Sequence, residues 1–81
     1  MAKFKFQLEA GVLLRKAVRI ELERSKDKLE YLYPGSSVSI REEKGWIDSI
    51  FYIQGTNFPD TDKFEKEIKV WFNKIESNCN S

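Results

Sequence analysis

The sequence contains no histidine and only one cysteine, so it lacks most of the side chains on which enzyme mechanisms depend. Histidine is the usual general acid or base near neutral pH, the base of catalytic triads and the commonest metal ligand. A single cysteine, Cys79, allows neither an intramolecular disulfide nor a cysteine zinc site. We therefore expect no catalytic residue, no metal site and no cofactor, and we predict that the protein is not an enzyme.

Clustered glycines and long hydrophobic runs are absent as well. The four glycines stand at least ten residues apart, whereas a loop that cradles phosphate needs several of them together. No segment approaches the roughly 18 consecutive apolar residues that a membrane-spanning helix requires. Because no signal peptide is visible and the lone thiol favours a reducing compartment, we expect a cytoplasmic protein without membrane contacts.

The composition that remains is that of a small folded domain. The chain has 81 residues, of which 41% are hydrophobic, 33% charged and 14% aromatic. This is enough bulky apolar material for one layer packed on another. Residues 1–81 are predicted to form one domain, in which residues 75–81 are a frayed polar tail.

Three segments have the two-residue periodicity of strands. Apolar and polar residues alternate from Lys3 to Glu9, from Ser37 to Arg41, and from Trp46 to about Gln54. The last segment has apolar residues on both faces, which predicts a central strand. Between the last two strands, residues 42–45 predict a hairpin turn that Gly45 closes in a left-handed conformation. Residues 55–59 are predicted to form a loop.

Two segments have helical periodicity. From Val12 to Tyr33 an apolar stripe repeats every three or four residues, and Pro34-Gly35 would end the helix. Residues 17–24 also alternate, so a strand there stays open as an alternative. A second helix is predicted after Asp60 or Thr61, either of which can cap it. Its apolar stripe is the clearest in the chain and consists of Phe64, Ile68, Trp71 and Ile75.

These elements predict an α+β fold with the order β-α-β-β-α. The strands would form a single antiparallel sheet with both helices packed on one face, as in a ferredoxin-like plan that lacks its last strand. The alternative order, β-β-(short α)-β-β-α, follows if residues 17–24 form a strand.

Charge is distributed unevenly along the chain. Residues 1–20 have a net charge of +4 and the rest has −3, although the whole chain has only +1. Two lysines on the polar face of the first strand and three basic residues on the polar side of the first helix account for this excess. The candidate partner-binding residues are Lys3, Lys5, Arg15, Lys16 and Arg19. Such residues either maintain solubility or steer an acidic partner.

By exclusion, the leading hypothesis for the function is a small non-enzymatic protein-interaction module, such as a regulator, adaptor or inhibitor. It would bind a protein partner through a sheet face or edge, and an open edge also allows a homodimer. The alternative is a domain that binds single-stranded nucleic acid through the basic N-terminal residues and exposed aromatic side chains.

One segment resembles the aromatic strand of RNA-recognition motifs. Lys44-Gly45-Trp46 precedes a strand that contains Phe51 and Tyr52, and such motifs stack bases on aromatic residues of this kind. The segment departs from the motif because Ile47 stands where a small residue is required and Asp48 where an aromatic residue is required. A nucleic-acid partner is therefore the second expectation, after a protein.

Overall fold

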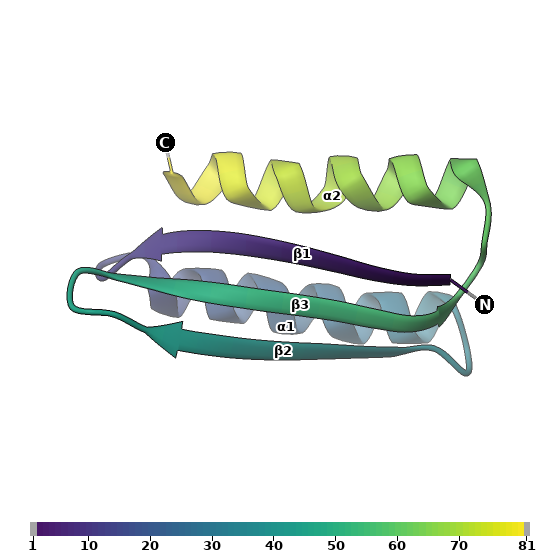
Figure 1. The fold of residues 1–81 in the computed structure, drawn as a ribbon, viewed down its shortest axis with the longest axis horizontal. Coiled ribbons are helices and arrows are strands. Elements are labelled where there is room, and N and C mark those ends of the chain that lie inside the picture. Colours follow the sequence, from purple (N-terminus) through teal and green to yellow (C-terminus); the bar gives the residue numbers. More distant parts are fainter. Residues whose placement is uncertain (1, 81) are drawn as a thin grey trace.

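The computed structural model describes the backbone of residues 2–80 and the side chains of residues 3–77. The chain forms three strands and two helices in the order β-α-β-β-α (Figure 1). The elements are β1 (Ala2–Gly11), α1 (Arg15–Leu32), β2 (Ser37–Lys44), β3 (Asp48–Phe58) and α2 (Asp62–Asn80). The predicted α+β class and element order are confirmed. The alternative strand at residues 17–24 is wrong, because this segment belongs to α1.

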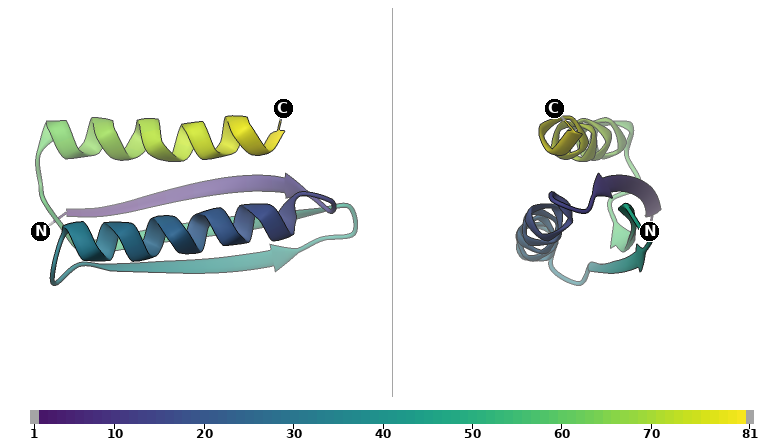
Figure 2. Two further views of the ribbon diagram at one scale, coloured as in Figure 1. Left: turned by 180° about the vertical axis from the view of Figure 1, so that it is seen from behind. Right: turned by 90° about the vertical axis from the view of Figure 1, so that its left-hand side faces the viewer.

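The three strands form an antiparallel sheet in the order β1-β3-β2, with β3 in the centre as its two apolar faces predicted. Both helices bury side chains against one face of this sheet, and α2 lies toward the β1 side (Figures 1 and 2). The opposite face is open. The closer comparison with a ferredoxin-like plan stays a prediction.

Residues 15–32 form a helix and not a strand because their helical stripe of apolar residues packs against the sheet. Val18, Leu22 and Leu29 are buried on this side, whereas Ile20, which the strand alternative would pair with them, is 45% exposed. The helix ends where Pro34-Gly35 was expected to end it. Gly35 has a φ angle of 90°, in the left-handed region that glycine adopts without strain.

The predicted hairpin is present, but its turn lies further along the chain than expected. Residues 42–44 continue β2 and pair with β3, and the connection consists of Gly45, Trp46 and Ile47. The Gly45 amide donates a hydrogen bond to the Asp48 carbonyl at 2.7 Å, and Gly45 does not have the predicted positive φ angle. Trp46 and Ile47 were assigned to the strand because they are apolar, yet both are exposed in the turn.

The loop predicted at residues 55–59 is also wrong, because β3 continues to Phe58. Gly55 pairs with both Phe4 and Val38 in the sheet. Its lack of a side chain therefore allows the ring of Phe4 to lie close to the backbone and does not serve a turn. The register of β1 and β3 shifts by one residue just beyond this point, where Asn57 has a φ angle of 63°. Turn-forming residues here produce a bulge within a strand.

The second helix begins as predicted. The Thr61 hydroxyl accepts a hydrogen bond from the Phe64 amide at 3.1 Å, which is the expected side-chain cap. The prediction of a frayed polar tail from residue 75 on is wrong, because α2 continues to Asn80 and Ile75 is buried. The side chain of Cys79 lies outside the described residues.

An aromatic cluster joins α2 to the sheet. The ring of Phe4 lies within 5.1–6.3 Å, between centroids, of the rings of Phe6, Phe58, Phe64 and Phe72. Tyr33 adds edge-on contacts from the end of α1 to the rings of Phe58 and Phe64. Each such pair contributes roughly 0.5–1.5 kcal/mol beyond the area it buries. The cluster therefore fixes α2 beside β1.

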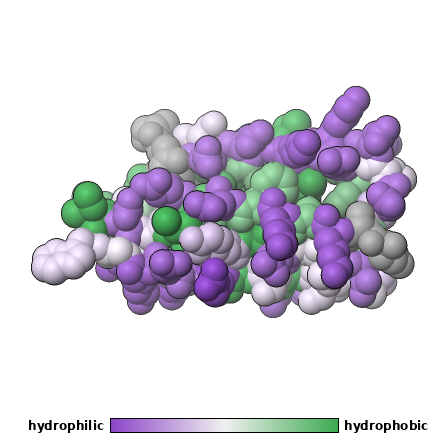
Figure 3. Space-filling model, viewed as in Figure 1, coloured by the Kyte–Doolittle hydropathy of each residue, from purple (hydrophilic) through white to green (hydrophobic). Residues whose placement is uncertain are grey.

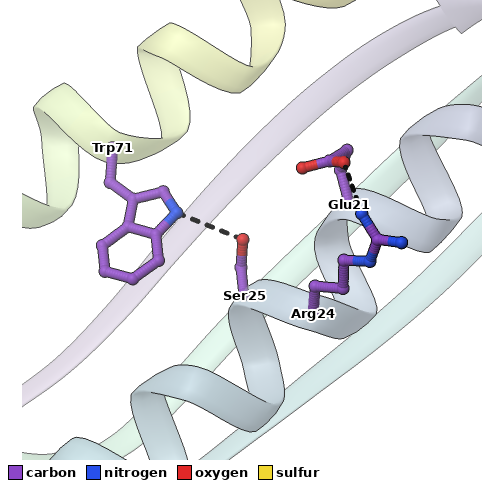
Figure 4. Close-up of polar contacts among 4 residues, drawn as sticks. All are labelled: Glu21, Arg24, Ser25 and Trp71. Atoms are coloured by element: carbon purple, nitrogen blue, oxygen red, sulfur yellow. Dashed lines mark hydrogen bonds and ion pairs between the residues drawn. The ribbon is translucent and has the colours of Figure 1, made fainter.

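A second contact joins the two helices directly. The indole N–H of Trp71 donates a hydrogen bond to the Ser25 hydroxyl at 3.1 Å (Figure 4). The ammonium group of Lys28 lies 5.2 Å from the centre of the Trp71 ring. Trp71 is only half-buried, whereas Ser25 is buried in the stripe of α1. The buried hydroxyl of Ser25 thus has a hydrogen-bond partner.

A double-mutant cycle measures this contact. We expect Trp71→Phe and Ser25→Ala to be coupled by about 0.5–1.5 kcal/mol in the free energy of unfolding, because each removes one side of the same hydrogen bond. Urea denaturation of both single variants and the double variant gives the coupling. The exposed Glu21–Arg24 pair, with 3.5 Å between its charged atoms, serves as the matched control (Figure 4). Its coupling should stay below about 0.5 kcal/mol.

Gly55→Ala should lower the free energy of unfolding by about 1–3 kcal/mol, because the added methyl group overlaps a packed ring. A Cβ atom at Gly55 would lie 2.1 Å from the ring of Phe4, which the aromatic cluster holds in place. Chemical denaturation tests this expectation. Gly11→Ala is the control, since nothing lies within 4 Å of its Cβ position, and it should change stability by less than about 0.5 kcal/mol. Equal effects of the two substitutions would contradict the packing argument.

Candidate interaction surfaces

A groove of about 370 Å³ runs between the N-terminal half of β1 and the N-terminal half of α2. We call it the β1 groove. Four consecutive β1 residues border it on one side, and the first turns of α2 with the segment before them border it on the other. Its lining residues are Lys3, Phe4, Lys5, Phe6, Pro59, Asp60, Thr61, Phe64, Glu65, Ile68 and Lys69. In Figure 3 hydrophobic surface is visible between α2 and the sheet.

The β1 groove has an apolar floor and a charged rim. Phe4 and Phe6 are half-buried and point to the helix side of the sheet, where Phe64 and Ile68 meet them. Lys3 and Lys5 alternate with these phenylalanines and are exposed on the open face. Lys69 forms an ion pair at 3.7 Å with Glu65 across the helical rim. The rim of β1 is therefore basic.

The two edges of the sheet differ in how their backbone groups are covered. At the β2 edge, the carboxylate of Glu30 accepts a hydrogen bond from the Val38 amide at 2.9 Å. No comparable side-chain bond to a β1 amide is present among the described residues. Edge strands with uncovered amides and carbonyls can pair with another extended chain. The β1 edge thus lacks the side-chain cover that Glu30 gives to one amide of the β2 edge.

The five basic residues predicted as a binding site do not form one surface. Lys3 and Lys5 lie at the end of the molecule where β1 begins, and Arg15, Lys16 and Arg19 lie at the other end, where α1 begins (Figure 1). From Lys5 to Gly11 alone, β1 spans about 20 Å at the usual rise per residue. The longest dimension of the molecule is 37 Å. Two separate basic groups result, of which only the first borders the β1 groove.

Arg19 differs from the other basic residues because its guanidinium forms an ion pair with Glu42. The Glu42 side chain lies on the helix side of β2 and is almost fully buried, at 8% exposure. Arg15, Lys16 and Lys44 surround the pair and line a shallow hollow with it. Arg19 therefore has a structural partner within the chain, whereas the residues around it face solvent.

Sequence reasoning missed a surface formed by two neighbouring loops, which we call the apolar end. It comprises the β1–α1 connection and the β2–β3 turn, joined by a 3.0 Å hydrogen bond from the Val12 amide to the Ile47 carbonyl. Trp46 is 100% exposed, Leu13 91% and Ile47 78%, and Val12 and Leu14 are partly exposed beside them. Figure 3 shows side chains protruding at this end of the molecule.

The sequence contains the apolar runs that form the apolar end, but each run could also be interpreted as part of a helix or strand. Val12, Leu13 and Leu14 read as the beginning of the helical stripe, and Trp46 and Ile47 read as the beginning of a strand. Each run lies directly beside a glycine, Gly11 or Gly45, where connections are common. Apolar residues next to turn glycines at both connections would have indicated two exposed tips at one end of the sheet.

Carboxylates lie next to the apolar end on the open face of the sheet. Glu9 and Asp48 carry neighbouring carboxyl groups. A hydrogen bond to Asp48, which only protonated Glu9 can donate, and the Asp48 charge together raise the pKa of Glu9 above its ordinary value of 4.5. Glu43 lies in the same cross-strand row, since Ile50 pairs with both Glu9 and Glu43. Like charges so placed repel one another at neutral pH.

Comparison with known proteins does not assign a function to these surfaces. No protein-family model, no curated protein and no solved structure matches the chain. Within the described part of the chain, no group of three or more acidic or cysteine side chains could hold a metal ion. Neither helix, as far as the structure describes them, is long and apolar enough to cross a bilayer.

Glu9→Gln should raise the free energy of unfolding at pH 7, because it removes a carboxylate that is disfavoured beside Asp48. A raised pKa means that the folded chain binds this proton more tightly than the unfolded chain does. Stability from Glu9 is therefore full below pH 4.5 and is lost as pH rises through the folded-state pKa. Urea denaturation at pH 7 and at pH 3 should show a gain at pH 7 alone. Glu67→Gln, on the exposed side of α2, should show no such pH-dependent gain, and a gain for Glu9→Gln at both pH values would contradict the explanation.

Proposed function

We propose that the protein is a small non-enzymatic interaction module that binds an extended segment of a protein partner in the β1 groove. The observation that carries this proposal is the groove along the exposed edge of β1. An added strand would pair its backbone with β1, as in other cases of strand addition. The pairing length supports a short segment, since Lys3 to Phe6 spans about 10 Å.

The position of α2 supports a single segment as the occupant. The helix forms the far wall of the β1 groove, so an incoming segment that pairs with Lys3 to Phe6 would rest against the first turns of α2. A second sheet docked edge to edge would instead have to displace α2, which the aromatic cluster holds at Phe64 and Phe72. A homodimer through this edge is therefore less well supported than a peptide partner.

The lining of the β1 groove also supports a particular partner chemistry. Side chains of an added strand alternate between the two faces of the sheet. One set would meet the apolar floor of Phe4, Phe6 and Ile68, and the other would lie beside Lys3 and Lys5 on the open face. Opposite charges on neighbouring strands stabilise pairing. The preferred segment would alternate apolar with acidic residues.

Selection from a phage-displayed random-peptide library tests the proposal. Peptides enriched on the immobilised protein should alternate apolar and acidic residues. A synthetic version should slow hydrogen exchange of the amides from Lys3 to Phe6 while leaving β2 unchanged. Replacing Lys3 and Lys5 by Glu should weaken its binding by about tenfold or more, which is about 1.4 kcal/mol.

The matched control replaces Lys66 and Lys74 by Glu, two exposed α2 lysines that do not line the groove. This variant should bind the same peptide with unchanged affinity. Peptides that protect amides elsewhere, or the absence of any enriched peptide, would overturn the proposal. Binding of a labelled single-stranded oligonucleotide, with affinity falling steeply as salt rises, would favour the nucleic-acid alternative instead.

A further inference from the structure

The apolar end has an exposed hydrophobic area that a small soluble domain rarely shows without a partner. Trp46, Leu13 and Ile47 are each more than three-quarters exposed, and the two loops that bear them are bonded to each other. Single exposed apolar residues need no explanation, but contiguous ones mark interaction sites. Trp46 alone can bury about 150–250 Å² in a contact.

Charges of opposite sign flank the apolar end on its two sides. On the open face of the sheet lie Glu9, Glu43 and Asp48, which together have a charge of −3. On the helix side lie four cations and one carboxylate with a charge of +3, namely Arg15, Lys16, Arg19, Lys44 and Glu42. The sheet separates the two groups, because residues that alternate along a strand point to opposite faces.

This arrangement is complementary to itself. A two-fold axis perpendicular to the long axis of the molecule can place the acidic side of one copy opposite the basic side of another. The apolar centres then meet, and both charge contacts form at once, as in an isologous interface. A partner surface of a single sign would be attracted on one side and repelled on the other. An anionic lipid surface would meet three carboxylates beside the inserting residues.

We propose that two copies of this chain associate end to end through the apolar end. Trp46, Leu13 and Ile47 form the centre of the interface, and the acidic side of each copy faces the basic side of the other. The interface leaves the β1 groove free, since the groove lies at the opposite end of the molecule (Figure 1). The association would also provide a counter-charge for Glu9 and Asp48, whose mutual contact raises the pKa of Glu9.

Sedimentation velocity and light scattering, from micromolar to millimolar protein, test the association. The mass should rise with concentration from 9.6 kDa toward twice that value. Trp46→Ala should weaken dimerisation by about thirtyfold or more, as expected for a central aromatic residue. Its fold should be unchanged by circular dichroism, since Trp46 is fully exposed. Val70→Ser, which removes an exposed apolar side chain on α2, is the matched control and should leave the dimer intact.

A charge reversal tests the two-fold arrangement separately. Glu9→Lys changes the charge of the acidic side from −3 to −1, and Lys16→Glu changes that of the basic side from +3 to +1, so each variant alone should dimerise at least tenfold more weakly. Mixed together, the two variants should form a heterodimer, because Lys at position 9 then faces Glu at position 16 and the unchanged Lys16 faces the unchanged Glu9. Heterodimer formation is the result expected from an isologous interface.

Three results would overturn the inference. The first is a chain that stays monomeric at millimolar concentration. The second is a dimer that Trp46→Ala does not weaken. The third is a monomer that instead binds vesicles of phosphatidylcholine and phosphatidylserine through Trp46, measured by a blue shift of its fluorescence that Trp46→Ala abolishes. Failure of the mixed charge variants to associate would overturn the two-fold arrangement.

Discussion

Packing of the Phe4 ring against the glycine gap at Gly55 is the contact on which the rest of the structure depends. A three-stranded sheet cannot bury two helices by its area alone, so the helices need a few large side chains that reach them. Phe4 reaches Phe64 and Phe72 of α2 because Gly55 has no side chain to hold its ring away from the sheet. The position of α2, and with it the far wall of the β1 groove, follows from this contact.

The same contact explains why the two ends of the molecule differ. The large aromatic side chains gather where β1 begins and β3 ends, so the core is thick at that end. At the other end the inward residues of the sheet are small or polar, such as Ala10 and Ser49. The buried hydroxyl of Ser49 has no hydrogen-bond partner among the described residues. Little core is available there to cover the connecting loops. Val12, Leu13, Trp46 and Ile47 therefore stay at the surface.

How far the sequence predicted the structure depended on whether a pattern had one physical meaning or two. The α2 stripe of Phe64, Ile68, Trp71 and Ile75 had one meaning, and its burial was predicted correctly except at Trp71, which is half-buried. Gly45 and Gly55 had two, because glycine serves both turns and close packing. Gly45 lies in the turn as predicted, although without the predicted left-handed conformation, whereas Gly55 was assigned to a loop and lies within β3. The β1 groove could not be predicted from periodicity, since it depends on how far α2 lies from β1. The five basic residues were found correctly as a compositional excess, but their separation into two groups depends on the length of β1.

The alternation of side chains across the sheet determines which charged residues lie together on each face. Glu42 and Glu43 are adjacent in sequence, yet one is paired with Arg19 on the helix side and the other lies in the carboxylate row of the open face. A chain with a net charge of only +1 thus has strongly basic and strongly acidic sides around one apolar end. The net charge is a sum in which the acidic and basic sides cancel, so it could not have indicated that the two sides complement each other. The two surfaces also make different demands on a partner, because the β1 groove offers backbone pairing to an extended segment and the apolar end offers side chains to a folded surface of matching charge. If both proposals hold, one small domain would bind a peptide and a second copy of itself at the same time, since the β1 groove and the apolar end lie at opposite ends of the molecule.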